Sequence, residues 1–142
     1  MTPIYQLNSK SVRRMIIDQA YRAHVGHIGS ALSVVDILVS LYRDILQRDL
    51  ADQNDRDRFI LSNGHTALAL YSVLHCLGIL SKEQLDNFCE DNSYLGVHPE
   101  FSLPGIDFAS GSLGQGLSFA AGCALAARVQ KSNRRAFVVL SD

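Results

Sequence analysis

Three histidines lie beside glycine in predicted loops, within the sequences GHIG, NGH and GVHPE around His27, His65 and His98. An imidazole near neutral pH can donate a hydrogen bond, accept one, or move a proton to or from a substrate oxygen. A neighbouring glycine lets backbone and ring crowd a ligand. Three such segments favour a functional role over the alternative that each glycine merely ends a helix. We therefore take these histidines as candidate catalytic residues.

Two other features could contact an anionic ligand. SGSLGQGLS (110–118) is a glycine-rich turn opening a helix, and free amides at a helix start attract anionic or carbonyl groups. It is neither a Walker motif nor a dinucleotide fingerprint, and tight packing is an equal alternative. Asp142 follows a predicted strand, where a carboxylate can bind Mg²⁺, end the strand or cap a helix. His24 and His75 lie within helical patterns and are interpreted as ordinary helix residues.

Helices and two short strands must position these residues. Apolar residues recur at helical spacing from Ser9 to Val25, and Gly26 is expected to end that helix. Capping patterns at Ser33 and Ser81 predict the start of two further helices. The remaining predictions are strands over RFILS (58–62) and AFVVL (136–140), helices over 34–46, 67–78 (ended by Gly78), 82–90 and 113–130, and a long loop over 90–112.

Strands separated by helices indicate one α/β domain over residues 1–142, with a parallel sheet flanked by helices. The first strand runs into Ser62–His65, and the second into Ser141 and Asp142. Open parallel sheets bind ligands at the carboxyl ends of their strands. The polar residues after both strands are therefore expected at one rim.

The bulk composition narrows the class of protein. The chain has 142 residues, 47% of them hydrophobic, and a net charge of −1, which suits one domain with a core. The charged fraction of 19% is low and hints at a partner interface. Balanced charge predicts no nucleic-acid partner, and the absence of a long apolar run predicts no membrane span. Three cysteines without a close pair favour reduced thiols and a cytoplasmic setting. The basic stretch 131–135 is interpreted as a solvated helix end.

Four segments together resemble the start of transketolases: GHIGSALSVVDILVSLY, DRFILSNGHTALALYSVLH, GVHPE and GSLGQGLSFAAG. They occur in the same order and spacing and cover nearly the whole chain. The sequence is most similar to members whose thiamine-diphosphate half is a separate N-terminal subunit. The SNGH segment argues against the related deoxyxylulose-phosphate synthases.

This resemblance implies a thiamine-diphosphate-binding α/β fold, Mg²⁺, and transfer of a two-carbon ketol unit from a ketose to an aldose, with sugar phosphates as substrates. By the resemblance, His27 lies near the bound sugar, His65 contacts the cofactor diphosphate, and His98 binds the ketol hydroxyl of the donor. It also implies that Asp142 is a metal ligand. The glycine-rich turn should meet the aminopyrimidine through Gly111, Ser112 and Leu113.

The chain also departs from the family pattern. Ile28 and Ser112 stand where full-length members carry proline, and Ser141 replaces the first glycine of the metal motif. The motif is expected to continue beyond Asp142 to an asparagine that completes the Mg²⁺ site. We therefore expect a domain incomplete at its C-terminus. It would need further residues or a C-terminal partner subunit, in a dimeric assembly, and would be inactive alone.

Two other hypotheses remain. A zinc hydrolase could use His27, His65 and His98 as a three-histidine site, although no pair has the local spacing typical of such sites. Alternatively, the chain is a non-catalytic domain that only docks to a partner, which its low charge and the small residues of 114–130 would suit.

Overall fold

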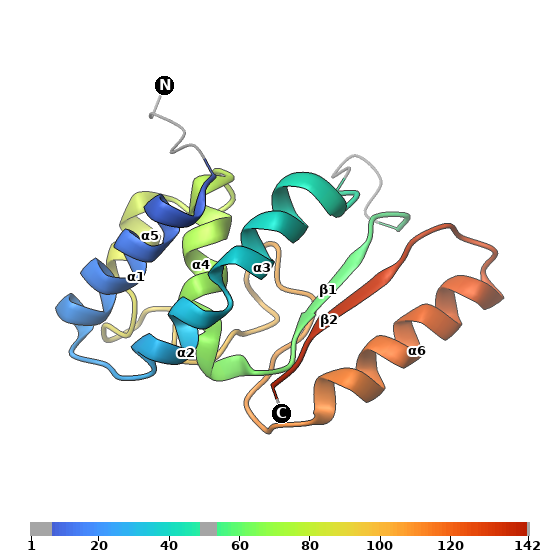
Figure 1. The fold of residues 1–142 in the computed structure, drawn as a ribbon. Coiled ribbons are helices and arrows are strands. Elements are labelled where there is room, and N and C mark those ends of the chain that lie inside the picture. The colour runs from blue at the N-terminus through green and yellow to red at the C-terminus, as the bar shows by residue number, and fades with distance from the viewer. Residues whose placement is uncertain (1–6, 49–53, 142) are drawn as a thin grey trace.

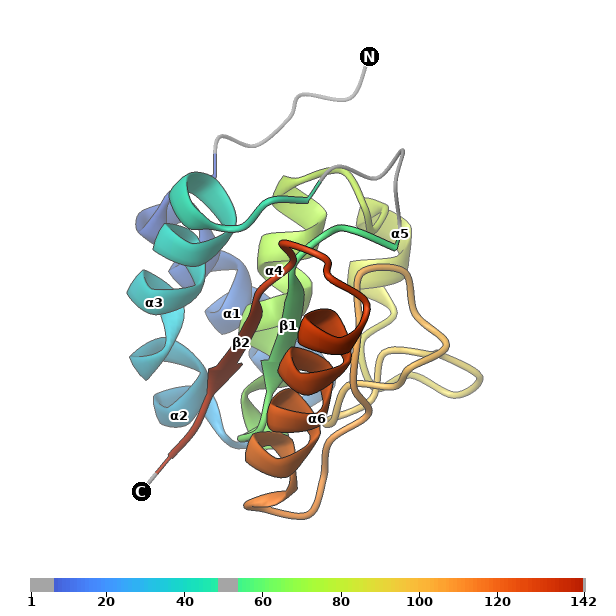
Figure 2. The same ribbon diagram turned by 90° about the vertical axis from the view of Figure 1, so that its right-hand side faces the viewer.

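The computed structural model describes residues 7–48 and 54–141, in which a parallel two-stranded sheet separates helix α6 from the other helices. Both views show α6 on one side of the sheet and α1 to α4 on the other (Figures 1 and 2). In chain order the elements are α1 (Ser9–Ala23), α2 (Ile28–Ser33), α3 (Val35–Ser40), the π-helical turn η1 (Leu41–Ile45), β1 (Arg58–Leu61), the 3₁₀ turn η2 (Gly64–Thr66), α4 (Ala67–Cys76), α5 (Lys82–Asp86), α6 (Gln115–Val129) and β2 (Ala136–Val139).

Strands β1 and β2 pair in parallel, as predicted, with Arg58 opposite Ala136 and Leu61 opposite Val139. The pairing is possible because α4, α5, the long loop and α6 together carry the chain back to the same end of the sheet. Ser62 donates its backbone N–H to the carbonyl of Val139 at 2.9 Å, which extends the pairing by one residue. The carboxyl ends of both strands therefore lie together, as expected.

Helix α1 ends differently from the prediction. Its first turn is capped by Asn8, whose side chain accepts a hydrogen bond from the backbone N–H of Ser11 at 2.9 Å. At the other end the left-handed residue is His24, with φ of 52°, and not Gly26. The prediction that Gly26 ends this helix is thus wrong, because His24 itself supplies the turn that glycine usually makes.

The second predicted helix begins earlier than its capping pattern indicated. Helix α2 starts at Ile28, directly after His27, and Ser33 is its last residue rather than a cap. The Ser33 hydroxyl donates to the carbonyl of Ser30 at 2.7 Å, so it is occupied within the helix. A distinct helix, α3, follows, because the chain bends at Val34.

Helix α4 follows the prediction closely, whereas α5 begins as predicted but ends at Asp86 and does not extend to residue 90. Nine of the ten residues of α4 are buried, and Gly78, with φ of 73°, follows its end. The capping box at α5 is present. The Ser81 hydroxyl accepts from the backbone N–H of Gln84, and the Gln84 side-chain oxygen accepts from the backbone N–H of Ser81. The loop after α5 has no regular element before α6.

The hydrophobic core lies between α4 and its neighbours. α4 packs against α1, α3 and α5, and its Tyr71, Leu70 and Leu74 are at most 2% exposed. Helix α6 by contrast carries exposed apolar side chains, among them Leu117, Leu125 and Val129. No helix within the described residues is long and apolar enough to cross a membrane.

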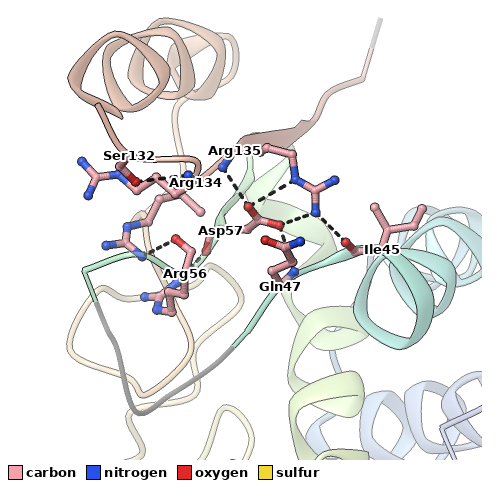
Figure 3. A network of polar contacts seen from close by, with 8 residues as sticks. Ile45, Gln47, Arg56, Asp57, Ser132, Arg134 and Arg135 are labelled. Carbon is pink, nitrogen blue, oxygen red and sulfur yellow. Dashed lines mark hydrogen bonds and ion pairs between the residues drawn. The ribbon is translucent and has the colours of Figure 1, made fainter. Parts of the chain in front are cut away.

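Asp57, whose side chain is fully buried, ties the amino ends of the two strands together (Figure 3). One carboxylate oxygen accepts from the backbone N–H of Arg135 at 2.8 Å. The other accepts from the N–H of Gln47 at 2.9 Å and from the Arg135 guanidinium at 2.6 Å. The guanidinium also donates to the carbonyl of Ile45 at 2.7 Å. Arg135 is therefore a structural partner, which corrects its interpretation as part of a solvated helix end.

A second ion pair supports the same end of the sheet. The Arg56 guanidinium and the Asp107 carboxylate approach to 2.5 Å with both side chains largely buried. Asp107 also accepts from the backbone N–H of Phe59 at 2.9 Å. The long loop is thereby attached to β1.

Asp57→Asn should destabilise the chain by about 2–3 kcal/mol, because it leaves Arg135 and two backbone amides without a charged acceptor. Burial alone raises the pKa of Asp57, but the bonds from Arg135 and the backbone lower it overall. A carboxyl group with a lowered pKa stabilises the fold above its unfolded pKa of about 3.9 and loses that contribution as the pH falls further. Urea denaturation between pH 7 and 3 should show a smaller fall in the free energy of unfolding for the variant than for the unsubstituted chain.

Asp44→Asn is the matched control for this prediction, since the exposed Asp44 pairs with its sequence neighbour Arg43. It should leave the denaturation midpoint unchanged. If Asp57→Asn left the denaturation midpoint as unchanged as Asp44→Asn does, Asp57 would not hold the strands in register.

Candidate functional site

The carboxyl ends of β1 and β2 lie at one edge of the molecule, together with the starts of α2, α4 and α6 (lower part of Figure 1). The segment after β1, Ser62–Gly64, is buried and leads directly into η2, which carries His65. The glycine-rich turn before α6 and the residues after β2 reach the same edge. Polar groups from separate parts of the chain are thereby brought together.

His27 and His65 lie side by side, with ring centroids 5.3 Å apart and planes at 49°. The backbone of His27 is left-handed, with φ of 63°, a conformation uncommon for residues other than glycine. The two rings border a water-sized hollow that is also lined by Gly26, Phe88 and Val97. Segments 38 residues apart in sequence thus present imidazoles to each other.

His98 joins this pair from the long loop. Its carbonyl accepts a hydrogen bond from the Tyr71 hydroxyl of α4 at 2.9 Å. A methyl group added to Gly111 would lie 3.9 Å from the His98 ring, so the glycine-rich turn packs against it. The three candidate histidines are therefore gathered at one site together with Gly111. His24 instead lies at the end of α1, with its ring tilted against that of Tyr21.

The pKa of His65 is lowered. Burial is the largest cause, because it disfavours the charged imidazolium, and the positive charges that His27 and His98 can carry lower the pKa further. The fold thus keeps His65 neutral near pH 7, able to accept a hydrogen bond or a proton.

Two glycines allow the turn to approach the end of β1 closely. A methyl group at Gly64 would lie 2.5 Å from the carbonyl oxygen of Ser110, and one at Gly116 would lie 2.5 Å from the Cβ of Ser62. The N–H of Gly116 donates to the Ser62 hydroxyl at 3.2 Å. Glycine is required at both positions because neither contact leaves space for a side chain.

Buried polar atoms without partners lie in these same segments. Within the described residues, the Oδ1 atom of Asn63 and the hydroxyl of Ser110 are buried and make no hydrogen bond. Buried polar groups in native proteins are almost always satisfied, so such atoms call for a ligand or water. Asn63 follows β1 directly, and Ser110 lies against Gly64.

A groove of about 400 Å³ opens at the carboxyl ends of the strands. It is lined by Ser62, Leu113, Leu117, Leu140 and Ser141. Leu113 thus reaches the groove, and Ser112 is exposed beside it. Asp142, the predicted metal ligand, lies outside the described residues.

Other hollows are less suited to ligand chemistry. One of about 270 Å³ lies at the amino ends of the strands, but its Asp57 and Asp107 are already paired with arginines. Among the residues the structure describes, no three histidine, cysteine or acidic side chains lie close enough to hold a metal ion. This geometry speaks against the three-histidine zinc site.

Tyr71 contacts His98 although no pattern in the sequence predicted a role for it. A tyrosine within the buried apolar helix ALALYSVLHC was the available signal, because a buried phenol usually finds a hydrogen-bond partner. The partner itself, a carbonyl 27 residues away, has no signature in the sequence.

The sequence matches a known family along most of its length. Residues 4–139 match the family described as "Transketolase, thiamine diphosphate binding domain". The chain therefore belongs to the transketolase family, in its thiamine-diphosphate-binding domain, and the predicted fold class is confirmed.

Curated relatives agree with this assignment. The chain is 38% identical over 139 residues to one subunit of the apulose-4-phosphate transketolase of Phocaeicola vulgatus, covering 96% of this chain and 50% of that protein. It is 41% identical over 124 residues to transketolase 2 of Escherichia coli, covering 84% of this chain and 19% of that protein. The chain thus spans half or less of the length of these relatives.

Solved structures share the fold. Transketolase from Leishmania mexicana superposes with a TM-score of 0.84 at 29% identity, covering all of this chain and 23% of that one. A Pichia stipitis transketolase in complex with sedoheptulose-7-phosphate gives a TM-score of 0.86 at 31% identity, covering 94% of this chain and 22% of that one.

Gly116→Ala should destabilise the chain by about 1–3 kcal/mol, because the new methyl group overlaps Ser62 and must push α6 from the end of β1. Gly122→Ala in the same helix is the control: it meets nothing within 4 Å and should stabilise by about 0.5–1 kcal/mol. Urea denaturation measures both. Equal changes in the free energy of unfolding for the two variants would show that Gly116 does not lie against Ser62 at the end of β1.

The imidazole of His65 should titrate below the ordinary histidine pKa of about 6.5. His27→Asn should raise the pKa of His65 by removing a neighbouring positive charge, and asparagine tolerates the left-handed backbone. Because the unfolded chain binds the proton more readily, stability should fall as the pH drops below about 6.5. NMR titration measures the pKa directly. His24→Asn is the control, and an equal shift there would contradict the proposed coupling.

Proposed function

We propose that this chain supplies the diphosphate-side half of the active site in a thiamine-diphosphate-dependent transketolase. The enzyme would transfer a two-carbon ketol unit from a ketose phosphate to an aldose phosphate. The observation that carries the proposal is the convergence of His27, His65 and His98 at the carboxyl edge of the sheet, in a domain of this family. The three segments are far apart in sequence and have no common structural need to meet there.

The residues present fit the cofactor. The strand-end groove of about 400 Å³, the glycines that bring the turn against β1, and the unpaired buried atoms of Asn63 and Ser110 lie at the same edge of the sheet and offer unused hydrogen-bonding groups. Gly111, Ser112 and Leu113 would hold the aminopyrimidine, and His65 would contact the diphosphate. Asp142 would be one of the residues that hold Mg²⁺, with ligands from further residues. When bound, thiamine diphosphate supplies carbanion stabilisation for cleavage and formation of the ketose carbon–carbon bond.

The histidines have separate proposed roles. His65, kept neutral by burial and by its two neighbours, accepts hydrogen bonds or a proton at the edge of the site. His98, fixed by its backbone, binds the ketol hydroxyl of the donor sugar. His27 lies beside His65 and faces the reacting part of the sugar, where it can donate a hydrogen bond to a sugar oxygen.

A complete site requires residues beyond the described part of the chain. The exposed apolar side chains of Leu117, Leu125 and Val129 on α6 and the unsatisfied buried atoms of Asn63 and Ser110 support a covering partner or chain segment. We propose a C-terminal transketolase subunit or the remainder of the same polypeptide, in a dimeric assembly. The free Cys76, Cys89 and Cys123 suit a cytoplasmic location.

Replacing each site histidine by asparagine in the complete enzyme should lower kcat/KM for ketol transfer by about 100-fold or more, since positioned acid–base groups contribute that much. His24→Asn, outside the site, should change it less than twofold. Turnover can be followed as aldose-dependent consumption of the ketose phosphate, and cofactor affinity by calorimetry with thiamine diphosphate and Mg²⁺.

Unchanged turnover in all three site variants would favour a non-catalytic docking domain. Stoichiometric zinc in the purified protein, lost together in these variants, would favour a zinc hydrolase. Tight cofactor binding by this chain alone would show that the site has been misplaced.

A further inference from the structure

We infer that Tyr71 is a positioning residue that sets the location of His98, through a hydrogen bond from its phenol to the His98 backbone. The inference rests on the proposed function, because it concerns the residue assigned to the donor sugar. Tyr71 lies on α4, six residues after His65, and is fully buried. Helix α4 would then support two of the three histidines: His65 in the turn η2 directly before it, and His98 through Tyr71.

The contact is well defined. The Tyr71 Oη atom donates to the carbonyl oxygen of His98 at 2.9 Å, within the ordinary range for such bonds. Burial raises the pKa of Tyr71 above its usual value, and the negative charge of Glu100 raises it further. The phenol therefore stays protonated and remains a donor throughout the physiological pH range.

Packing holds the phenol in its orientation. The Tyr71 ring meets the edge of Phe88 with centroids 6.1 Å apart and planes at 63°, a geometry favoured by aromatic pairs. Phe88 in turn lines the hollow that His27 and His65 border. The donor thus projects from a rigid part of the core rather than from the surface.

The position of His98 depends on contacts with other segments. Its segment lies in the long loop between α5 and α6, which has no regular secondary structure. Two successive backbone carbonyls attach this segment to the rest of the fold. The His98 carbonyl accepts from the Tyr71 hydroxyl, and the Pro99 carbonyl accepts from the N–H of Ser110 at 3.3 Å. The first bond joins the loop to α4 and the second joins it to the glycine-rich turn. Without the shorter bond, this segment would keep the bond from Ser110 to Pro99 but lose its hydrogen bond to α4.

Tyr71→Phe removes only the hydroxyl and keeps the ring against Phe88. In the complete enzyme we expect KM for the ketose to rise about five- to tenfold, the effect of losing one buried hydrogen bond, with kcat reduced less than threefold. Affinity for thiamine diphosphate, measured by calorimetry, should be unchanged because His65 and the groove are not altered. In NMR spectra of this chain without cofactor, the Cε1–H signal of His98 should shift or broaden while that of His24 stays in place.

Tyr94→Phe makes the same chemical change in the same loop, where the side chain is 75% exposed, and is the matched control. It should leave all four measurements unchanged. If Tyr71→Phe weakened cofactor binding as much as it raised KM, the residue would support the whole fold rather than His98, and the inference would be overturned. An unchanged KM would overturn it as well.

The combination with His98→Asn separates this inference from the proposed function. Residues that act through one another are non-additive, so Tyr71→Phe should change KM less than twofold when His98 is already replaced. If Tyr71→Phe raised KM as much in the His98→Asn background as it does alone, Tyr71 would act on something other than His98. If instead His98→Asn alone left KM for the ketose unchanged, the role proposed for His98 would fail, whatever the NMR spectra of Tyr71→Phe showed.

Discussion

The arrangement of the site depends on the hydrogen bonds that the buried carboxylate of Asp57 accepts. This carboxylate lies at the amino ends of both strands and accepts from the backbone of Arg135 and from that of Gln47, which fixes β2 and the segment after η1 against β1. A parallel pair has no hairpin to set its register, so another contact must do so. With the register fixed at one end, the polar residues that follow Leu61 and Val139 are brought level at the other end.

Close packing then converts this alignment into a site. Gly64 and Gly116 let the glycine-rich turn lie against the end of β1, at distances that would exclude any side chain. The buried helix α4 provides the other support, because it begins beside His65 and reaches His98 through Tyr71. Polar atoms of Asn63 and Ser110 remain without partners inside this packed region. Such atoms carry a cost in folding that a bound ligand can offset.

Local patterns were reliable where the signal and the structure involve the same few residues. The capping box of Ser81 and Gln84, the turn at Gly78 and both strands were predictable for this reason. Ser33 and Gly26 carried equally plausible local signals, but the chain begins α2 earlier and ends α1 at His24. Arg135 was expected to be solvated and instead pairs with Asp57, 78 residues away. In each of these cases tertiary contacts outweighed a weak local preference.

The sequence alone determined the alternation of helices and strands, the parallel sheet, and the three glycine-flanked histidines as candidates for chemistry. It could do so because hydrophobic periodicity and residue type are local properties. Only the tertiary structure decided that the rings of His27 and His65 lie 5.3 Å apart, that the Tyr71 hydroxyl bonds to His98, and that Asn63 and Ser110 are left unsatisfied. These features depend on distances between segments remote in the chain, which are set by packing the whole core and have no signature in any single stretch of sequence.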